Sequence, residues 1–275
     1  TGVQVLGLTT AGVVALGTAG VVTLTTGAIA GLGTTNTTAL TAAQITALTS
    51  SQISALTTSQ LANLSTTQVQ SIEGADFNIL TTTQLNALGT TNIANLSADQ
   101  TVGLTSTQAA GLTSANLNAL STKQIRFLQS TALTALSTSQ LAAMSTANFA
   151  ALSISQIARL TTSQVAAFNS QRMGSVDNSV LQNMTAGQIQ SLTAAAVTAL
   201  ATDKLAKLTT TQVTSLTADQ MGALTTSEAT ALTTTQVAAM EVADLKALSS
   251  TQVSALTATQ IGALTAAQLI GLMGK

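Results

Sequence analysis

Two pairs of carboxylates occupy matching places in the sequence, and they are the residues best suited to binding a metal ion. Glu73 stands three residues before Asp76, and Glu241 stands three residues before Asp244. Carboxylate oxygens are ligands that Ca²⁺ prefers, so these four residues are candidates for a shared calcium site. Carboxylates are also favoured in the first turn of a helix, where they interact with its dipole. We predict this helix-stabilising role and no metal site, with calcium binding as the alternative.

The residue types that enzymes use most often are absent from the chain. It has no His and no Cys, which excludes a Ser-His-Asp triad, a thiol nucleophile and imidazole or thiolate metal sites. No phosphate-binding loop or dinucleotide fingerprint occurs. Lys123 with Arg126, and Asp203 with Lys204 and Lys207, are typical of solvated helix faces. We therefore predict that the protein is not an enzyme and uses no cofactor.

Composition excludes several classes of partner. The 275 residues include 8 basic and 9 acidic side chains, which give a net charge of −1. The excess of positive charge that is typical of nucleic-acid-binding proteins is therefore absent. Aromatic residues make up only 1%, so stacking platforms for single strands are missing. Thr or Ser interrupts every apolar stretch, which predicts no membrane span. The 45% hydrophobic content is too high for a disordered tail. We therefore expect the low-complexity sequence to form an ordered, repetitive structure.

An eight-residue repeat runs through the whole chain without insertion or deletion. Every position that is a multiple of eight, from Leu8 to Leu272, carries a large apolar residue, usually Leu. Thr or Ser usually follows it, Gln usually stands three residues later, and a second apolar residue comes next. Met144, Met184 and Met240 replace Leu in phase, which indicates core packing. The consensus is L-[ST]-[TSA]-x-Q-[VIL]-x-[AS], and its unbroken phase indicates that octads stack on one another.

Each octad carries the signals that begin a helix. In the octad at Leu40, Thr41 is the expected N-cap and Gln44 the third helical residue, N3, which together make a capping box. Leu40 and Ile45 are the two halves of a hydrophobic staple. The predicted core residues are Leu40, Ile45, Leu48, Ile53, Leu56, Leu232, Val237, Leu256, Ile261 and Leu264, and the predicted capping residues are Thr41, Gln44, Thr233, Gln236, Thr257 and Gln260.

The octads predict an all-α fold, a solenoid or superhelix of very short capped helices with one helix per repeat. Such a helix is unstable alone and must bury its apolar residues against others. One continuous helix is disfavoured because an eight-residue period turns the Leu by roughly 80° per repeat. A β-solenoid is the alternative, favoured by Thr and Val, although the two apolar sites would face opposite sides of a strand. The period fixes neither the handedness nor the octads per coil, for which two is our working assumption.

Two segments depart from the consensus. Residues 1–40 are rich in Gly and Val and carry no charge, and Gly12 and Gly20 replace the capping Gln. We expect this segment to pack on another subunit or an upstream domain, or alternatively to be an atypical end cap on the octapeptide-repeat solenoid of residues 41–275. Residues 169–184 also lose Thr-x-x-Gln, which predicts a kink or a contact site, with a domain boundary as the alternative. The chain begins at Thr1, so we expect a mature or excised piece of a longer protein.

The octads LTAAQITA (40–47), LTTTQVAA (232–239) and LTATQIGA (256–263) resemble those of long octapeptide-repeat proteins of proteobacteria. The resemblance covers nearly the whole chain. Proteins of this kind look like large secreted or surface proteins, which implies an extracellular or cell-surface location and roles in adhesion, filaments or matrix. The Gly/Asp-rich nonapeptide calcium repeats of type I secreted proteins are absent here.

These observations lead to one expected function and one alternative. We expect a structural extracellular protein: a subunit of a self-assembling filament, sheath or surface layer, or the stalk of an adhesin. Its partners would be copies of itself. The alternative is an ice-binding module, because a regular array of Thr side chains could order water.

Overall fold

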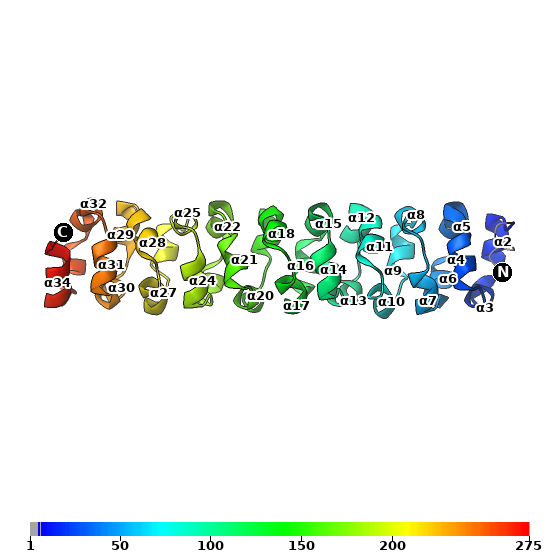
Figure 1. Cartoon of the computed structure of the whole chain (residues 1–275), viewed down its shortest axis with the longest axis horizontal. Helices are drawn as coiled ribbons and strands as arrows, with labels where there is room; N and C mark the ends of the chain where they lie inside the picture. Colours follow the sequence, from blue (N-terminus) through cyan, green and yellow to red (C-terminus); the bar gives the residue numbers. More distant parts are fainter. Residues whose placement is uncertain (1–4, 6, 275) are drawn as a thin grey trace. The chain divides into compact units, whose positions relative to one another are not determined.

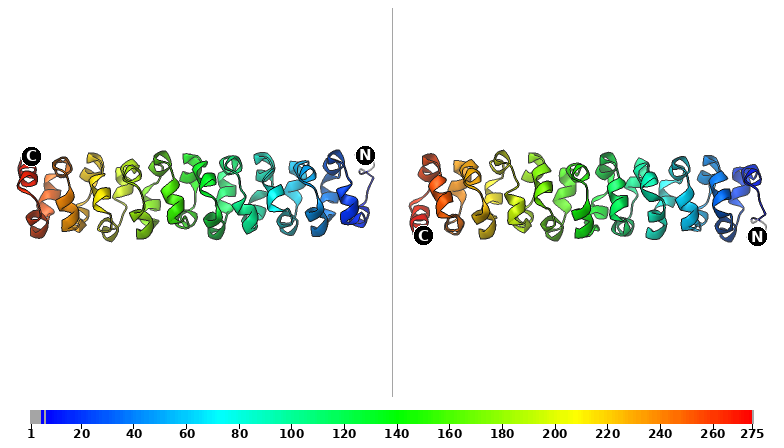
Figure 2. Two further views of the ribbon diagram at one scale, coloured as in Figure 1. Left: turned by 90° about the horizontal axis from the view of Figure 1, so that it is seen from below. Right: turned by 90° about the horizontal axis from the view of Figure 1, so that it is seen from above.

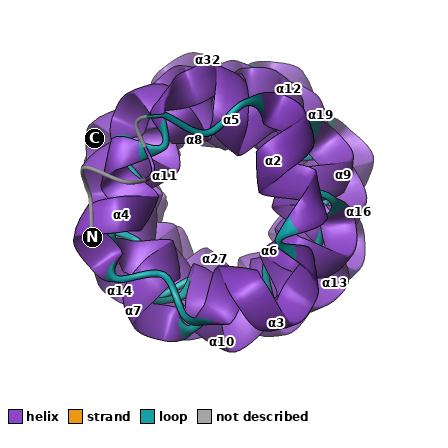
Figure 3. Cartoon of the chain, turned by 90° about the vertical axis from the view of Figure 1, so that its right-hand side faces the viewer, coloured by secondary structure: helices purple, strands orange, loops and turns teal. Residues whose placement is uncertain are grey.

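The computed structural model of the chain describes residues 5 and 7–274. They divide into two compact units, unit 1 ending at Met144 and unit 2 beginning at Ser145. Short helices joined by turns build both units, and no strand occurs among the described residues (Figure 3). The predicted all-α solenoid is therefore confirmed, and the β-solenoid alternative is wrong. Residues 7–40 lie in unit 1 together with the octads that follow them.

Almost every octad holds one helix, and in each unit the helices follow one another in sequence order (Figures 1 and 2). Unit 1 contains α2 (Thr10–Ala15), α3 (Gly17–Val22), α4 (Thr26–Gly31), α5 (Gly33–Ala39), α6 (Ala42–Ala47), α7 (Ser50–Ser54), α8 (Thr58–Asn63), α9 (Thr66–Gln70), α10 (Gly74–Phe77), α11 (Thr82–Ala87), α12 (Gly89–Ala94), α13 (Ala98–Val102), α14 (Ser106–Gly111), α15 (Ser114–Ala119), α16 (Thr122–Phe127), α17 (Ser130–Thr134) and α18 (Thr138–Ala143). Unit 2 contains α19 (Thr146–Ala150), α20 (Ile154–Arg159), α21 (Thr162–Ala166), α22 (Ser170–Ser175), α23 (Asn178–Gln182), α24 (Ala186–Ser191), α25 (Ala194–Val197), α26 (Thr202–Leu205), α27 (Thr210–Thr214), α28 (Ala218–Ala223), α29 (Thr226–Ala231), α30 (Thr234–Ala239), α31 (Val242–Ala247), α32 (Ser250–Ala255), α33 (Ala258–Gly262) and α34 (Ala266–Met273).

The local sequence explains where each helix begins and ends, and α24 is representative. Thr185 has extended backbone angles, and its hydroxyl accepts a hydrogen bond from the Gln188 amide at 3.2 Å. The Gln188 side chain accepts one from the Thr185 amide at 2.9 Å, which completes the capping box. Leu192 ends the helix with extended angles, φ −64° and ψ 146°, and so turns the chain towards the next cap. An N-cap of this kind stabilises its helix by about 1 kcal/mol.

Helices pack mainly on the helix three places further along, rather than on the next one. In unit 1, α3 contacts α6 and α5 contacts α8, and in unit 2, α28 contacts α31. Hydrogen bonds join residues that are 28 apart, which is three and a half octads and replaces our working value of two. Seen from its N-terminal end, unit 1 turns clockwise from α2 through α3 and α4 to α5 as it recedes (Figure 3), so its superhelix is right-handed.

The core of each unit consists of the two apolar positions of each octad. Phe77 in unit 1 is fully buried, as are Phe149 and Phe168 in unit 2, whose rings meet edge to face at 4.6 Å. The three in-phase methionines are also buried. Full burial of one such side chain contributes about 1.5–3 kcal/mol. The buried residues among those predicted for the core are Leu40, Ile45, Leu48, Ile53, Leu56, Leu232, Val237, Leu256 and Leu264.

Ile261 is the exception among the predicted core residues, because it is only partly buried. It lies on α33, within the last turn of unit 2. Helix α34 packs on α31, three places before it, whereas no helix of the described residues stands three places after α33. The octad pattern predicts which side chain points inward, whereas full burial also needs the following turn.

Residues 169–184 keep the phase despite their unusual sequence. Asn169 replaces Thr as the N-cap of α22, and its side chain accepts a hydrogen bond from the Arg172 amide at 3.1 Å. Met173, Leu181 and Met184 remain buried. Asp177, the N-cap of α23, makes no side-chain capping bond. Buried core residues therefore keep both octads in phase, with a side-chain cap on α22 only.

Candidate functional site

The most distinctive feature of both units is a set of buried Gln side chains at N3, which we call the glutamine ladder. Gln100 on α13 illustrates its geometry. Its side-chain oxygen accepts a hydrogen bond from the Ser97 amide at 3.0 Å, while its NH₂ group donates to the carbonyls of Val69 at 2.7 Å and Ile72 at 2.9 Å. One side chain therefore completes the start of its own helix and satisfies carbonyls at the end of a helix one turn earlier.

The same arrangement recurs through both units. The acceptor carbonyls lie 27 to 31 residues before the Gln, and the Gln side chains are at least 90% buried. Each satisfied hydrogen bond contributes about 1 kcal/mol, and a buried polar group without its partner costs about 1–3 kcal/mol. The Gln residues with both kinds of bond include Gln44, Gln52, Gln60, Gln68, Gln84, Gln100, Gln108, Gln124 and Gln140 in unit 1, and Gln188, Gln212, Gln220, Gln236, Gln252, Gln260 and Gln268 in unit 2.

The predicted capping Gln residues belong to this ladder, and each forms a capping box with its predicted Thr. Capping boxes join Thr41 to Gln44, Thr233 to Gln236 and Thr257 to Gln260. The Thr hydroxyls are thus occupied as acceptors for the N3 amides. Ice binding through the same Thr side chains stays a prediction, for which thermal hysteresis is the direct measurement.

Asn replaces Gln in two octads in which Gly takes the place of the N-cap Thr. Gly33 and Gly89 are the first residues of α5 and α12, with φ of +69° and +73°, which Gly adopts at little cost. The N-caps Leu32 and Leu88 have helical angles, so no extended residue precedes these helices. Asn36 and Asn92 then donate to the carbonyl 28 residues earlier, at 2.9 and 3.0 Å. The shorter amide therefore preserves the contact between turns although it forms no capping box.

A second Asn compensates where Asn follows a normal cap. Asn116 is too short to reach back to the Thr113 amide, and the Asn86 side chain takes over from the previous turn. Its oxygen accepts hydrogen bonds from the Thr113 amide and the Asn116 side chain, both at 3.0 Å. Its NH₂ group donates to the Gly111 carbonyl at 2.7 Å. The two Asn residues together supply what one Gln supplies elsewhere.

Lys204 corrects our prediction of a solvated face. It stands at N3 of α26, is partly buried, and its ammonium group donates to the carbonyls of Gly174 and Val176, both at 2.7 Å. These carbonyls lie 30 and 28 residues earlier, as in the ladder. Three ammonium donors suit two carbonyl acceptors, so the long side chain takes the place of the Gln amide. Asp203 and Lys207 are exposed as predicted.

Two of the charged residues at N3 in unit 2, Glu228 and Arg172, are largely buried. Glu228 accepts a hydrogen bond from the Thr225 amide at 2.6 Å and keeps the capping box, but an ionised carboxylate has no proton to donate to the previous turn. Arg172 is 7% exposed, and burial lowers the pKa of its guanidinium from the usual value. Charged side chains are therefore tolerated at N3, although desolvating them is unfavourable for the free energy of folding.

The four calcium candidates lie in two separate places. Asp76 accepts a hydrogen bond from the Ser50 hydroxyl in unit 1, and Asp244 accepts one from the Glu241 amide at 2.8 Å in unit 2. Burial raises the pKa of Asp244, with a further rise from the nearby Glu241 charge. Glu73 is exposed and makes no capping bond. No group of three acidic side chains suited to a metal ion gathers within the described part of the chain.

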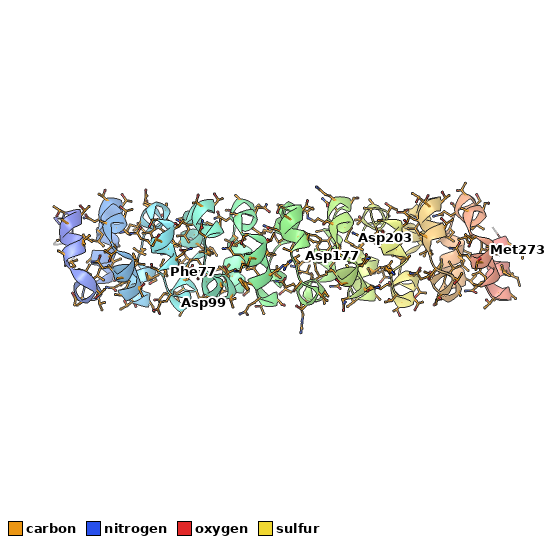
Figure 4. All side chains as sticks on the ribbon, turned by 180° about the vertical axis from the view of Figure 1, so that it is seen from behind. Phe77, Asp99, Asp177, Asp203 and Met273 are labelled. Atoms are coloured by element: carbon orange, nitrogen blue, oxygen red, sulfur yellow. The ribbon has the colours of Figure 1, made fainter. Side chains whose placement is uncertain are left out.

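Other acidic side chains lie on the outside of their units. Asp99 in unit 1 and Asp177 and Asp203 in unit 2 are exposed, in contrast to the enclosed ring of Phe77 (Figure 4). Among the described residues, no helix is both long enough and apolar enough to span a bilayer.

Comparison with known families agrees with the octads. Residues 69–106, 135–170 and 237–273 match the family profile described as ALTTAQ repeat. This chain is a repeat protein. A search of curated protein sequences found no match to it. The matched segments of the repeat protein contain helix starts with the Gln contacts described above, such as those of Gln100 and Gln252. The secreted or surface context implied by the resemblance stays a prediction.

The donor half of each Gln is the functional feature that our sequence reasoning missed. Capping boxes accept Glu as readily as Gln, and the helix dipole favours Glu. Yet in this repeat protein Gln occupies 18 of the 33 N3 positions from residue 12 to residue 268, and Glu occupies one. That bias indicates a need for an NH₂ group beyond the local cap.

Proposed function

We propose that this repeat protein is a structural component of an extracellular assembly: a subunit of a filament, sheath or surface layer, or the stalk of an adhesin. The observation that carries the proposal is the glutamine ladder, because it hydrogen-bonds turns to one another with side chains buried in the wall of each unit. The functional groups of the ladder are used for cohesion and leave no reactive group exposed.

The ladder suits a protein that bears load. Pulling along the superhelix axis of a unit would have to break the contacts of one turn after another, and each Gln contributes its bonds to both of the turns it joins. In solenoids of this type stability is close to a sum of repeat terms and nearest-neighbour interface terms. The ladder adds to the interface term of each turn, so local opening of one turn is resisted by its neighbours.

Exposed apolar side chains near the two ends support self-association. Val14 and Val22 in the first turn of unit 1 are 45% and 43% exposed, and Ile270 and Met273 on α34 are 67% and 77% exposed. No charged residue occurs among the first 72 residues to oppose close contact. The ladder itself would stop at a junction with a second copy, because Gly12, Gly20 and Ala28 cannot donate. Contacts between copies would therefore rest on apolar burial.

Negative-stain microscopy and multi-angle light scattering of the purified chain over a concentration series test the proposal. We expect elongated assemblies whose mass grows with concentration. The double variant Ile270→Ser/Met273→Ser should shift assembly to higher concentration while its far-ultraviolet dichroism stays helical. A wild-type chain that remains monomeric at every concentration would contradict the filament and sheath forms of the proposal. Surface labelling of source cells with an antibody would test the location separately.

A further inference from the structure

Helix α16 departs from the repeat at three positions at once. Phe127 is the one aromatic residue of the chain outside the two core positions, in a place where other octads mostly carry Ala, Ser, Gly or Asn. Lys123 and Arg126 are the only Lys and Arg among the first 144 residues. None of the three side chains is needed by the cap or the core, which Ser121, Gln124 and Ile125 supply as in other octads.

A groove of about 260 Å³ lies beside Phe127 and extends over three turns of unit 1. Gln70 of α9, Asn95 after α12, and Ser121, Lys123 and Phe127 around α16 line it. The polar walls are held in place, since Gln70 donates to the Asn95 carbonyl at 2.6 Å and the Asn95 side chain donates to the Thr91 carbonyl at 2.8 Å. The Lys123 ammonium lies 6.0 Å from the centre of the Phe127 ring.

We propose that this groove binds a carboxylate-bearing sugar residue, such as one unit of an acidic polysaccharide. A pyranose ring presents C–H groups on its face, which would be buried against the partly exposed Phe127 ring. The side chains of Gln70 and Ser121 offer hydrogen-bond partners to its hydroxyls, and Lys123 offers a charge to its carboxylate. The groove holds about one such ring, because pockets for drug-sized molecules are about 300–1,000 Å³.

The charges and the shape favour this occupant over others. Two cations on one short helix are too few for nucleic acid, whose binding rests on many phosphate contacts. A purely apolar ligand would cover the Lys123 ammonium group without offering it a partner. The groove is part of the outer surface, so the sugar chain could continue on either side of the bound unit. This site is independent of the assembly proposed above and does not need it.

Isothermal titration calorimetry of the whole chain with tetragalacturonate tests the site, with maltotetraose as a neutral probe and tetraglutamate as a carboxylate probe without a sugar ring. We expect tetragalacturonate to bind, with affinity that falls as salt rises, and the other two to bind at least tenfold more weakly. Phe127→Ala and Lys123→Thr restore residues common at these positions, so both should fold, and each should weaken binding by roughly tenfold.

Ile79→Ala is the matched control, because Ile79 occupies the position of Phe127 in another octad, is 44% exposed and is not in the groove. It should leave the affinity unchanged. Absence of tetragalacturonate binding, equal binding of maltotetraose or tetraglutamate, or full binding by Phe127→Ala would each overturn the assignment.

Discussion

The first turn of unit 1 and the turn after it share the octad but differ in the ladder. Residues 9–32 have Gly12, Gly20 and Ala28 at N3, whereas residues 41–68 have Gln at every N3. The hydroxyls of Thr9 and Thr25 still accept the N3 amides at 3.2 and 3.1 Å, and the helices still form. A helix start therefore does not need the Gln, but the hydrogen bond to a preceding turn needs a donor side chain at N3, which Gly and Ala lack.

This difference shows that the ladder has a direction. Gln44 and Gln52 donate to the carbonyls of Val13 and Val21, so the first turn accepts hydrogen bonds from the turn after it. Gly and Ala at its own N3 positions offer no amide in the opposite direction, whatever lies on that side. They end the ladder without leaving a buried NH₂ group unpaired, which would cost about 1–3 kcal/mol.

The largest loss of stability should come from replacing a ladder Gln with Ala, one of the residues found at N3 in the first turn. Gln100→Ala removes one capping bond and two donors. The Ile72 carbonyl loses its partner, whereas the Val69 carbonyl keeps the hydrogen bond from the Ile72 amide at 3.1 Å. We expect a loss of about 2–3 kcal/mol in the free energy of unfolding, measured by urea denaturation. Gln100→Glu keeps the acceptor but removes the donors, so it should lose nearly as much.

Thr107→Ala, at an exposed site one octad later, is the control and should change stability by less than about 0.5 kcal/mol. Wild-type stability in Gln100→Glu would show that the donor half of the ladder contributes nothing.

The next effect should come from the turn in which two Asn residues replace one Gln. Asn86→Ala removes the partners of the Thr113 amide and the Gly111 carbonyl, and one of the two acceptors of the Asn116 side chain. We expect a loss of about 1–2 kcal/mol. Adding Asn116→Gln should recover much of it, because the longer side chain could reach the Thr113 amide and form the usual box. A double-mutant cycle measures this coupling, and strictly additive changes would argue against the exchange of roles.

A gain in stability should follow where the ladder lacks a donor. Glu228→Gln keeps the bond from the Thr225 amide and adds an NH₂ group directed at the turn before. It also removes a buried carboxylate. We expect an increase of about 1 kcal/mol, seen as a higher midpoint in thermal unfolding at pH 7. Ser227→Ala, on the exposed side of the same helix, is the control. A lower midpoint for Glu228→Gln would mean that the carboxylate has a partner of its own.

The sequence predicts local structure well because the octad contains both halves of each local interaction. Thr41 and Gln44, or Leu40 and Ile45, are close in sequence, so cap, staple and inward face could all be identified from residue types. The number of octads per turn depends on how helices pack across 24 to 31 residues, and the period carries no information about it. Lys204 shows the same limit: its charge indicates solvent, while the carbonyls it binds lie 28 and 30 residues away.

The smallest effect should come from placing a ladder residue in the first turn. Gly12→Ala should stabilise α2 through helix propensity alone, by up to about 1 kcal/mol. Gly12→Gln could add a return bond to the Thr9 amide, but among the described residues no earlier turn offers carbonyls to its NH₂ group. We therefore expect the free energies of unfolding of the two variants to differ by less than about 0.5 kcal/mol. The corresponding difference between Gln and Ala at residue 100 is expected to be about 2–3 kcal/mol. Amide hydrogen exchange in α2 and α13 would compare the two turns directly. An equally large advantage of Gln over Ala at both positions would mean that the local capping box, and not the bond to the preceding turn, accounts for the stabilisation by Gln.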